Sequence, residues 1–535
     1  MSKARKRALN NTERRKVAIS SEFELWQGKV ARVLVILLMC IVPLYFTSER
    51  YLTLAKQKYE FFMLCMCVIL LAVLVIWVLR MVIKPRLFPQ DKLEVADWAV
   101  LGFAAVTVLS ALLTPFGEDA SVWGGLYGRY DGAIAQLMYV AIFFIVSRWY
   151  KPRMMDLNFF CMSAILVALI GILQFYGMDF FRLWPNHLAE HRADNFYDIF
   201  FRTTLGNVNT VSAYACVAVL LCGFLFVRKA PRSEDGGGGW TAGVRWQPLW
   251  VAASALSFWL MEIGGSDSGR VGVLAAAFLA VPFIVESMKC LGRFLILVSS
   301  WLAVYALQRL LYEVVILDAR TMGSLIPFVV LFVLLAVAGF ILIRFGEEPN
   351  PEAAAKWKLG VIIIVACIAA GIFGIEVMGQ PEMNSGRVIT EAREILHGNI
   401  PDEFGTNRVY IWRNALGAFA ANPIIGTGPD TFALAFPQEA QGFYGEFYDK
   451  AHNEYIQLLI CQGMLGLLCY LVFLGAVLFT SIRKAFKNPL AAALAVAIVG
   501  YCVQAFFNIS TPTVTHLLWV SAGMLVNKRV RAWHA

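Results

Sequence analysis

Residues 451–466 read AHNEYIQLLICQGMLG, and this stretch lies where a long polar loop meets a new hydrophobic helix. His452 stands at the boundary, where a side chain can contact both water and a lipid-borne substrate. An imidazole can also take up a proton near neutral pH. The stretch therefore predicts a membrane helix that begins near Tyr455, with a candidate proton acceptor just before it.

The composition of the whole chain predicts an integral membrane protein with an all-α fold. Of its 535 residues, 59% are hydrophobic and 16% are charged, and the mean hydropathy is +0.65. Soluble proteins are roughly half apolar and about a quarter charged. The apolar runs indicate a polytopic bundle of about 12–14 transmembrane helices. These runs lie near residues 30–47, 61–83, 95–113, 133–148, 157–176, 207–228, 248–263, 270–288, 291–310, 324–344, 359–378, 455–480, 490–508 and 514–527.

The Lys and Arg residues between the runs predict the orientation. Cytoplasmic connections are enriched in Lys and Arg, and every second connection here is basic, from residues 80–86 to residues 528–531. This placement accounts for the net charge of +9 and argues against a nucleic-acid partner. The predicted layout is a cytoplasmic tail (1–29), transmembrane helices within 30–378, an extracytoplasmic loop (379–454), further helices within 455–527 and a cytoplasmic tail (528–535).

The long loop is expected to contain short helices, one of which presents Arg408. Thr406 or Asn407 can cap a helix that starts at Arg408, and Asn422-Pro423 ends it. Free backbone N–H groups and the helix dipole favour an anion at such a first turn, so the guanidinium adds a forked phosphate donor. The alternative interpretation is a solvated first-turn arginine.

Three other polar positions are predicted on the same outer face. His452 is expected to stay neutral beside a helix N-terminus and to serve as a general base, oriented by Asp449 or Glu454. Arg270 lies at the mouth of a span, where a charged side chain is costly and is a functional candidate. Arg202, followed by Asn207 and Asn209, has the same character. The alternatives are an interfacial histidine without a chemical role and arginines that extend to the interface.

A turn and an aromatic segment complete the loop. Gly426 and Gly428 form a tight turn whose backbone can approach a ligand, although an ordinary glycine turn fits as well. The Phe and Tyr residues between 436 and 455 suit an interfacial belt or the faces of sugar rings, and we favour the belt for most of them. The sequence contains no metal-binding or nucleotide-binding motif. We therefore expect no cofactor and no metal, with arginines neutralising a pyrophosphate.

Taken in order, these blocks resemble the bacterial O-antigen ligase and Wzy-type polymerase superfamily. The matching stretches are residues 266–270 (SDSGR), Arg408 with Trp412, residues 423–428 (PIIGTG), residues 452–454 (HNE) with Gly463 and Gly466, and more weakly residues 202–209. The superfamily often has Ser-Arg-Gly in the first block, whereas here Gly269 precedes Arg270. The blocks cover roughly residues 200–275 and 405–470.

The resemblance implies a GT-C-like fold in the bacterial cytoplasmic membrane, with both termini cytoplasmic and the active site on the outer face. It implies a metal-independent, inverting transfer of a glycan from undecaprenyl diphosphate to a hydroxyl of a glycan, lipid or protein acceptor. Arg270 and Arg408 would hold the diphosphate, and His452 would take the proton from the attacking hydroxyl. Substrate contacts are expected from the remaining positions of the blocks, Arg202, Asn209, Gly426, Gly428, Asn453 and Glu454.

A second function class fits the span count. A flippase that moves the same lipid-linked glycan would also need arginines, but it should carry charges deep within several spans and show related halves. The spans here hold few charges and residues 379–454 form a disproportionately long loop, so we favour the enzyme. A structural partner of an envelope-building complex is a third possibility and predicts that loss of His452 is tolerated. The sequence leaves the acceptor, the sugars and the oligomeric state open.

Overall fold

The computed structural model confirms an all-α, multi-pass membrane protein. It describes residues 22–48, 53–83, 92–117, 121–126, 128–183, 203–228, 246–312, 314, 325–346, 391, 394–395, 397–485 and 488–531. Within these ranges the chain forms helices, turns and bends, with no strand. Arg202 and the predicted span at 359–378 lie outside the described residues.

Eight described helices are long and apolar enough to cross a membrane. They are Glu22–Leu44, α3 (Leu54–Ile83), α4 (Val95–Leu112), α6 (Met154–Phe175), α8 (Val208–Val227), α12 (Met288–Leu311), α13 (Ile326–Phe345) and the first part of α18 (Glu454–Ala485). The first of them includes the π-helical turn η1 (Leu37–Ile41) and α2 (Val42–Leu44). Shorter helices are α5 (Ala133–Trp149), α9 (Gln247–Ile263), α19 (Pro489–Ala505), α20 (His516–Val526) and α21 (Lys528–Arg531).

Side-chain caps fix where several of these helices begin. The Asn207 side chain accepts a hydrogen bond from the Asn209 N–H at 2.8 Å at the start of α8. Asn488 does the same for Ala491 at 3.0 Å at the start of α19. Such caps satisfy N–H groups that have no partner within the helix. The polar Asn207 at the predicted span entry is therefore a helix cap.

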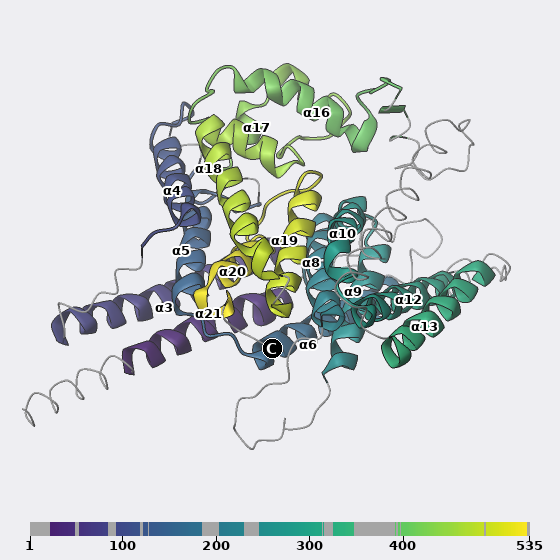
Figure 1. Ribbon diagram of the computed structural model, residues 1–535. Helices are drawn as coiled ribbons and strands as arrows, with labels where there is room; N and C mark the ends of the chain where they lie inside the picture. Colours follow the sequence, from purple (N-terminus) through teal and green to yellow (C-terminus); the bar gives the residue numbers. More distant parts are fainter. Residues whose placement is uncertain are drawn as a thin grey trace, which may run out of the picture.

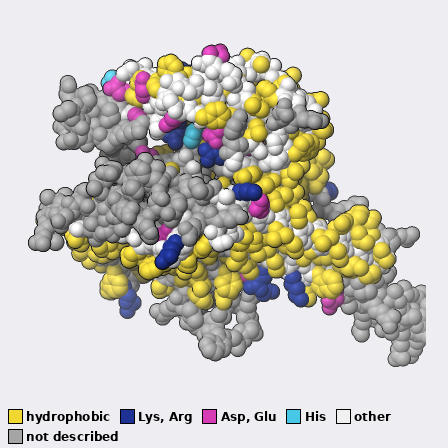
Figure 2. Space-filling model, turned by 180° about the vertical axis from the view of Figure 1, so that it is seen from behind, with side chains coloured by type: hydrophobic (Ala, Val, Ile, Leu, Met, Phe, Trp, Pro, Cys, Tyr) yellow, Lys and Arg dark blue, Asp and Glu magenta, His cyan; other side chains and the backbone are white. Residues whose placement is uncertain are grey.

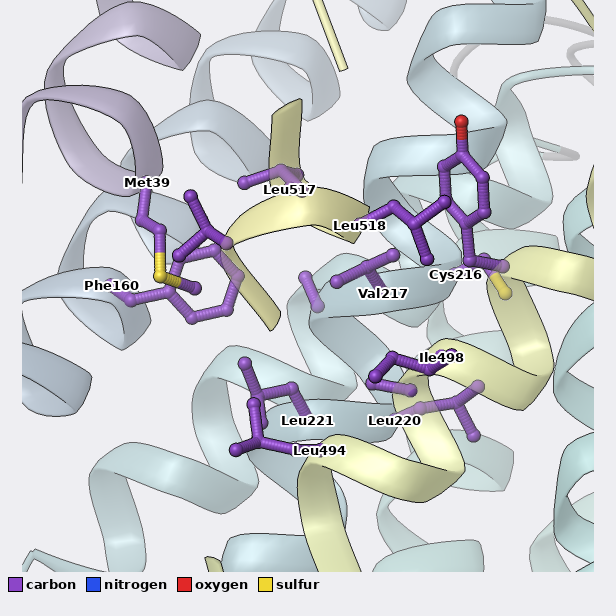
Figure 3. Close-up of a cluster of buried hydrophobic side chains, with 14 of the residues drawn as sticks. Met39, Phe160, Cys216, Val217, Leu220, Leu221, Leu494, Ile498, Leu517 and Leu518 are labelled. Carbon is purple, nitrogen blue, oxygen red and sulfur yellow. The ribbon is translucent and has the colours of Figure 1, made fainter. Parts of the chain in front are cut away.

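The buried centre of the bundle is α8. Every side chain in its apolar stretch is enclosed, and the helix packs against α9 and α19. Figure 3 shows part of this core, where Leu220 of α8 lies beside Ile498 of α19 and Leu221 of α8 lies beside Leu494 of α19. Beside it, α10 (Asp267–Leu279) crosses α19 at small residues, since a Cβ on Gly272 would lie 2.7 Å from the Gly500 carbonyl oxygen. Small residues allow this close backbone approach in membrane helices.

One predicted span does not form a single continuous helix. The run near 270–288 is divided into α10 and the short α11 (Val281–Ile284), because Pro282 lacks the N–H that a continuous helix would use. The other spans that fall on described residues match observed helices to within a few residues at most ends. The first helix is longer than predicted, since it is already formed at Glu22.

Residues 397–453 form a lobe at one end of α18, on the opposite side from α21 (Figure 1). The lobe contains α16 (Phe404–Phe419), α17 (Phe432–Ala435) and the 3-10 turn η7 (Gln438–Ala440). Its core is aromatic, with Tyr410, Phe432, Phe436 and Tyr448 buried together. The predicted interfacial belt is therefore wrong for Phe436 and Tyr448, whereas Phe443 and Phe447 are exposed.

Candidate active site

His452 lies directly before the cap of α18. The Asn453 side-chain oxygen accepts from the N–H groups of Tyr455 at 3.0 Å and Ile456 at 3.1 Å, which fixes the start of the helix. His452 itself has φ 48°, a left-handed conformation that costs a non-glycine residue free energy and is frequent at functional sites. Its buried Nδ1 atom has no hydrogen-bond partner among the described residues. The imidazole therefore keeps an unused nitrogen.

Charged groups from three segments surround this imidazole. Burial lowers the pKa of His452 to about 4, and the positive charge of Arg408 acts in the same direction. Asp449 opposes the shift, while Arg129 and Lys450 add to it. His452 is therefore neutral near pH 7, as predicted. No hydrogen bond within the described residues joins it to Asp449 or Glu454, which the sequence suggested as orienting groups.

Arg408 reaches the site because α16 is anchored one turn further along. Residues 405–407 all have left-handed backbone angles, so they form a kink in place of the predicted cap, and regular helix follows. The Trp412 indole N–H donates to the Ala451 carbonyl at 2.8 Å. Positions four apart share a helix face, so this bond also brings Arg408 toward residue 452. Arg408 and His452, both predicted from the sequence, are thus brought together by the fold.

Arg129 was missed by sequence reasoning. It lies in the turn before α5, and its Nε donates to the Asp449 carboxylate at 2.5 Å. Asp449 lies three residues before His452 in the sequence. A signal was present, because Arg129 is a basic residue in a connection predicted to be outer, where such residues are scarce. The partner 320 positions away could not be read from the sequence.

A buried ion pair joins the three segments behind the site. The side chains of Lys450 and Asp430 are 2% and 1% exposed and form a salt bridge. The other oxygen of Asp430 accepts from the Leu126 N–H at 2.8 Å and the Asp131 N–H at 3.4 Å. Asp430 therefore holds together the turn before α5, the glycine turn and the segment that leads to His452.

The predicted glycine turn packs against α18. Gly463 interrupts the helix with φ 66° and ψ −172°. The glycine turn packs against α18 at this kink. Four backbone hydrogen bonds connect the two segments: Thr427 to Ile460 (3.1 Å), Gly428 to Cys461 (2.8 Å), Met464 to Pro423 (2.8 Å) and Leu465 to Ile424 (3.1 Å). A Cβ on Gly426 would lie 2.4 Å from the Gln462 nitrogen. This close approach is to the protein's own backbone, and a substrate contact at Gly426 and Gly428 stays a prediction.

Replacing Gly463 by alanine is expected to destabilise the protein by about 1–3 kcal/mol or more, because this backbone region is open essentially to glycine alone. The new Cβ would also lie 2.3 Å from the Ile424 carbonyl oxygen. Gly417→Ala in α16 is the matched control, since its Cβ would meet nothing within 4 Å. Thermal unfolding in detergent measures both. Equal melting temperatures for Gly463→Ala and the wild type would contradict the packing described.

Arg270 is already held by carboxylates of its own region. Its Nη1 donates to Asp267 at 2.7 Å, and its Nε donates to Glu262 at 3.2 Å. Its Nη2 donates to the Glu262 carbonyl at 2.9 Å. Arg270 is not among the four charged groups with the largest effect on the pKa of His452. The structure thus joins Arg408 with His452 and gives Arg270 different partners, which use three of its five N–H donors. A role for Arg270 on a diphosphate stays a prediction.

The other predicted substrate residues are occupied within the fold. The Asn209 side-chain oxygen accepts from the Ser266 hydroxyl at 3.2 Å. The Glu454 carboxylate accepts from the hydroxyls of Tyr470 at 2.5 Å and Tyr501 at 3.2 Å. It borders an internal cavity of about 20 Å³, enough for roughly one water. Substrate roles for Asn209, Asn453 and Glu454 therefore stay predictions.

The site combines a neutral base, His452, with the guanidinium groups of Arg408 and Arg129 at the edge of the hydrophobic helix bundle. Figure 2 shows basic and acidic side chains gathered near the place where the lobe meets the hydrophobic surface. Such a base can take a proton while neighbouring positive charges stabilise an anion that forms beside it. The chemistry that fits is displacement of an anionic leaving group by a hydroxyl.

The chain is similar to known proteins over part of its length. Residues 310–471 match the family model described as O-antigen ligase, a range that contains Arg408 and His452. The chain is also 26% identical over 139 residues to the exopolysaccharide production protein ExoQ of Rhizobium meliloti (strain 1021). That match covers 24% of this chain and 32% of the relative, so the chain spans about a third of that relative's length.

Proposed function

We propose, from its place in the O-antigen ligase and Wzy-type polymerase superfamily and from the site around His452, that this chain transfers a glycan from a polyprenyl diphosphate to an acceptor hydroxyl. The donor would be a glycan on undecaprenyl diphosphate. The observation that carries the proposal is a neutral His452 beside Arg408 and Arg129 at the end of a membrane helix. The product would be a surface polysaccharide or a ligated glycan, in keeping with the exopolysaccharide production named for the relative.

In the proposed reaction, His452 removes the proton from the acceptor hydroxyl as its oxygen attacks the anomeric carbon. The bond between that carbon and the diphosphate oxygen breaks, and the diphosphate leaves with the electron pair. Attack opposite the leaving group inverts the anomeric centre. The arginine charges stabilise the leaving group as its negative charge grows. In this scheme the base and the arginines act without a metal, and Arg270 would also bind the diphosphate.

The pH dependence of the rate should follow the charge near His452. We expect kcat/KM, which reports the free enzyme, to fall as the pH drops through about 4, because protonated imidazole cannot accept a proton. Once the donor is bound, its negative charge offsets Arg408 and Arg129 and raises the pKa of His452. The acid limb of kcat should therefore lie at higher pH than that of kcat/KM. Coincident limbs at the usual histidine pKa would contradict this account.

The location of the site is proposed from charge and shape. Basic side chains lie along the edge of the apolar surface away from the lobe (Figure 2), as expected for a cytoplasmic side. The lobe and His452 would then face outward from the bacterial cytoplasmic membrane, with both termini inside. An outer site reaches a donor only after its glycan has crossed the membrane.

A flippase for the same lipid is the alternative function. The test uses purified protein in liposomes with an undecaprenyl-diphosphate oligosaccharide, an acceptor glycan and EDTA. A new glycosidic bond, with undecaprenyl diphosphate released, would support the transferase. Movement of the intact donor between leaflets without bond formation would move the protein to the flippase class. Comparing glycan, lipid and protein acceptors in the same assay distinguishes polymerase, ligase and protein glycosylation.

A further inference from the structure

Arg129 has donors that its ion pair does not use. Its Nε contacts the Asp449 carboxylate, and the side chain is 28% exposed. The two terminal nitrogens of the guanidinium have no hydrogen-bond partner among the described residues. These nitrogens form the planar fork that matches phosphate oxygens. An arginine held through Nε, with its fork open, can bind an anion without losing its first partner.

The backbone around Arg129 is fixed on both sides. The Arg129 N–H closes a turn onto the Leu126 carbonyl at 3.0 Å. Asp430 holds the Leu126 and Asp131 N–H groups, and a Cβ on Gly125 would lie 2.7 Å from the Asp430 carboxylate. The neighbouring Tyr130 stacks on Tyr59 of α3, with ring centroids 4.8 Å apart. Arg129 is therefore positioned before any ligand arrives, which reduces the ordering cost of binding.

Arg129 and Arg408 approach His452 from different parts of the chain. Arg408 comes from α16, whereas Arg129 comes from the turn before α5 through Asp449. A diphosphate bears several negative charges, and one guanidinium neutralises only part of them. Asp449 lowers the positive charge of the site, because its carboxylate partly cancels the charge of Arg129.

We propose that Arg129 is a further substrate-binding residue, whose terminal guanidinium nitrogens bind the donor diphosphate together with Arg408 while Asp449 holds its Nε. This inference rests on the proposed function. Two roles for the ion pair between Arg129 and Asp449 can be distinguished by experiment. If the pair only holds the fold, loss of either partner should have the same effect. If Arg129 binds the diphosphate, loss of Asp449 frees positive charge and should strengthen binding.

The test measures binding of undecaprenyl diphosphate and undecaprenyl monophosphate to the purified full chain in lipid nanodiscs. The proteins compared are the wild type, Arg129→Gln, Asp449→Asn and Arg413→Gln. Arg413 is the matched control, because it also pairs with an aspartate of the lobe, Asp402 at 2.5 Å, but is 57% exposed. We expect Arg129→Gln to weaken diphosphate binding by about tenfold or more, Asp449→Asn to preserve or strengthen it, and Arg413→Gln to leave it unchanged.

Two results would overturn the role of Arg129 while leaving the proposed function intact. One is wild-type diphosphate affinity in Arg129→Gln. The other is an equal loss in Arg129→Gln and Asp449→Asn, which would make the ion pair structural. If Arg129→Gln does not fold, Asp449→Asn decides alone, since weakened binding there contradicts the proposal. A wild type that binds monophosphate as well as diphosphate would instead refute the proposed function, and the inference with it.

Discussion

Replacement of His452 by alanine is expected to lower the rate of glycan transfer by about 10²–10⁴-fold, the usual contribution of a general base. The loss should appear in kcat at saturating donor, because the imidazole acts on the attacking hydroxyl and not on donor binding. His452→Gln should be equally slow, since an amide can hydrogen-bond but cannot take up the proton. Initial rates of glycosidic-bond formation measure the effect.

The control for this experiment is His397→Ala, which removes an exposed histidine of the same lobe. It should transfer at the wild-type rate. Unchanged melting temperatures would show that the His452 variants are folded. A folded His452→Ala protein with wild-type kcat would remove this residue from the chemistry and favour the interpretation as an interfacial histidine.

Replacement of Lys450 by methionine is expected to destabilise the protein by about 3–5 kcal/mol, because it leaves the buried Asp430 carboxylate without its opposite charge. The carboxylate would keep its hydrogen bonds from the Leu126 and Asp131 N–H groups, but not its salt bridge. Since Asp430 joins the segments that carry Arg129 and His452, transfer activity should fall together with stability. Denaturant or thermal unfolding in detergent gives the change in free energy.

The double variant Lys450→Met with Asp430→Asn is to be compared with Lys450→Met alone. Asparagine removes the uncompensated charge and keeps an oxygen that can accept the backbone N–H groups. The double variant should therefore be more stable than Lys450→Met alone. If both variants unfold at the wild-type temperature, the ion pair does not hold these segments together.

The helices were predictable because they depend on local composition. Long apolar runs form helices in a membrane, where backbone groups must be satisfied internally. The break at Pro282 was visible as a proline but lay inside an uninterrupted apolar run. The aromatic residues of the lobe were harder to place, because a buried core at Phe436 and Tyr448 requires a tertiary partner that the sequence does not display.

The site was predictable where a residue carries its own chemical signal. His452 and Arg408 stand out by type and by position at helix starts, and the fold brings them together. Arg129 and the pair of Lys450 with Asp430 act through partners distant in sequence or through burial. Gly426 and Gly463 are required by one backbone packing against another. Such contacts arise only when the chain has folded.

The most direct test of the central claim is the stoichiometry of the reaction in EDTA, for wild type and His452→Ala. Mass spectrometry would count new glycosidic bonds and released undecaprenyl diphosphate from a lipid-linked oligosaccharide. We predict equal amounts of both products from the wild type and a loss of both in the variant. Equal product from the folded variant, or loss of the wild-type reaction in EDTA that added metal restores, would contradict a metal-free transfer with His452 as the base.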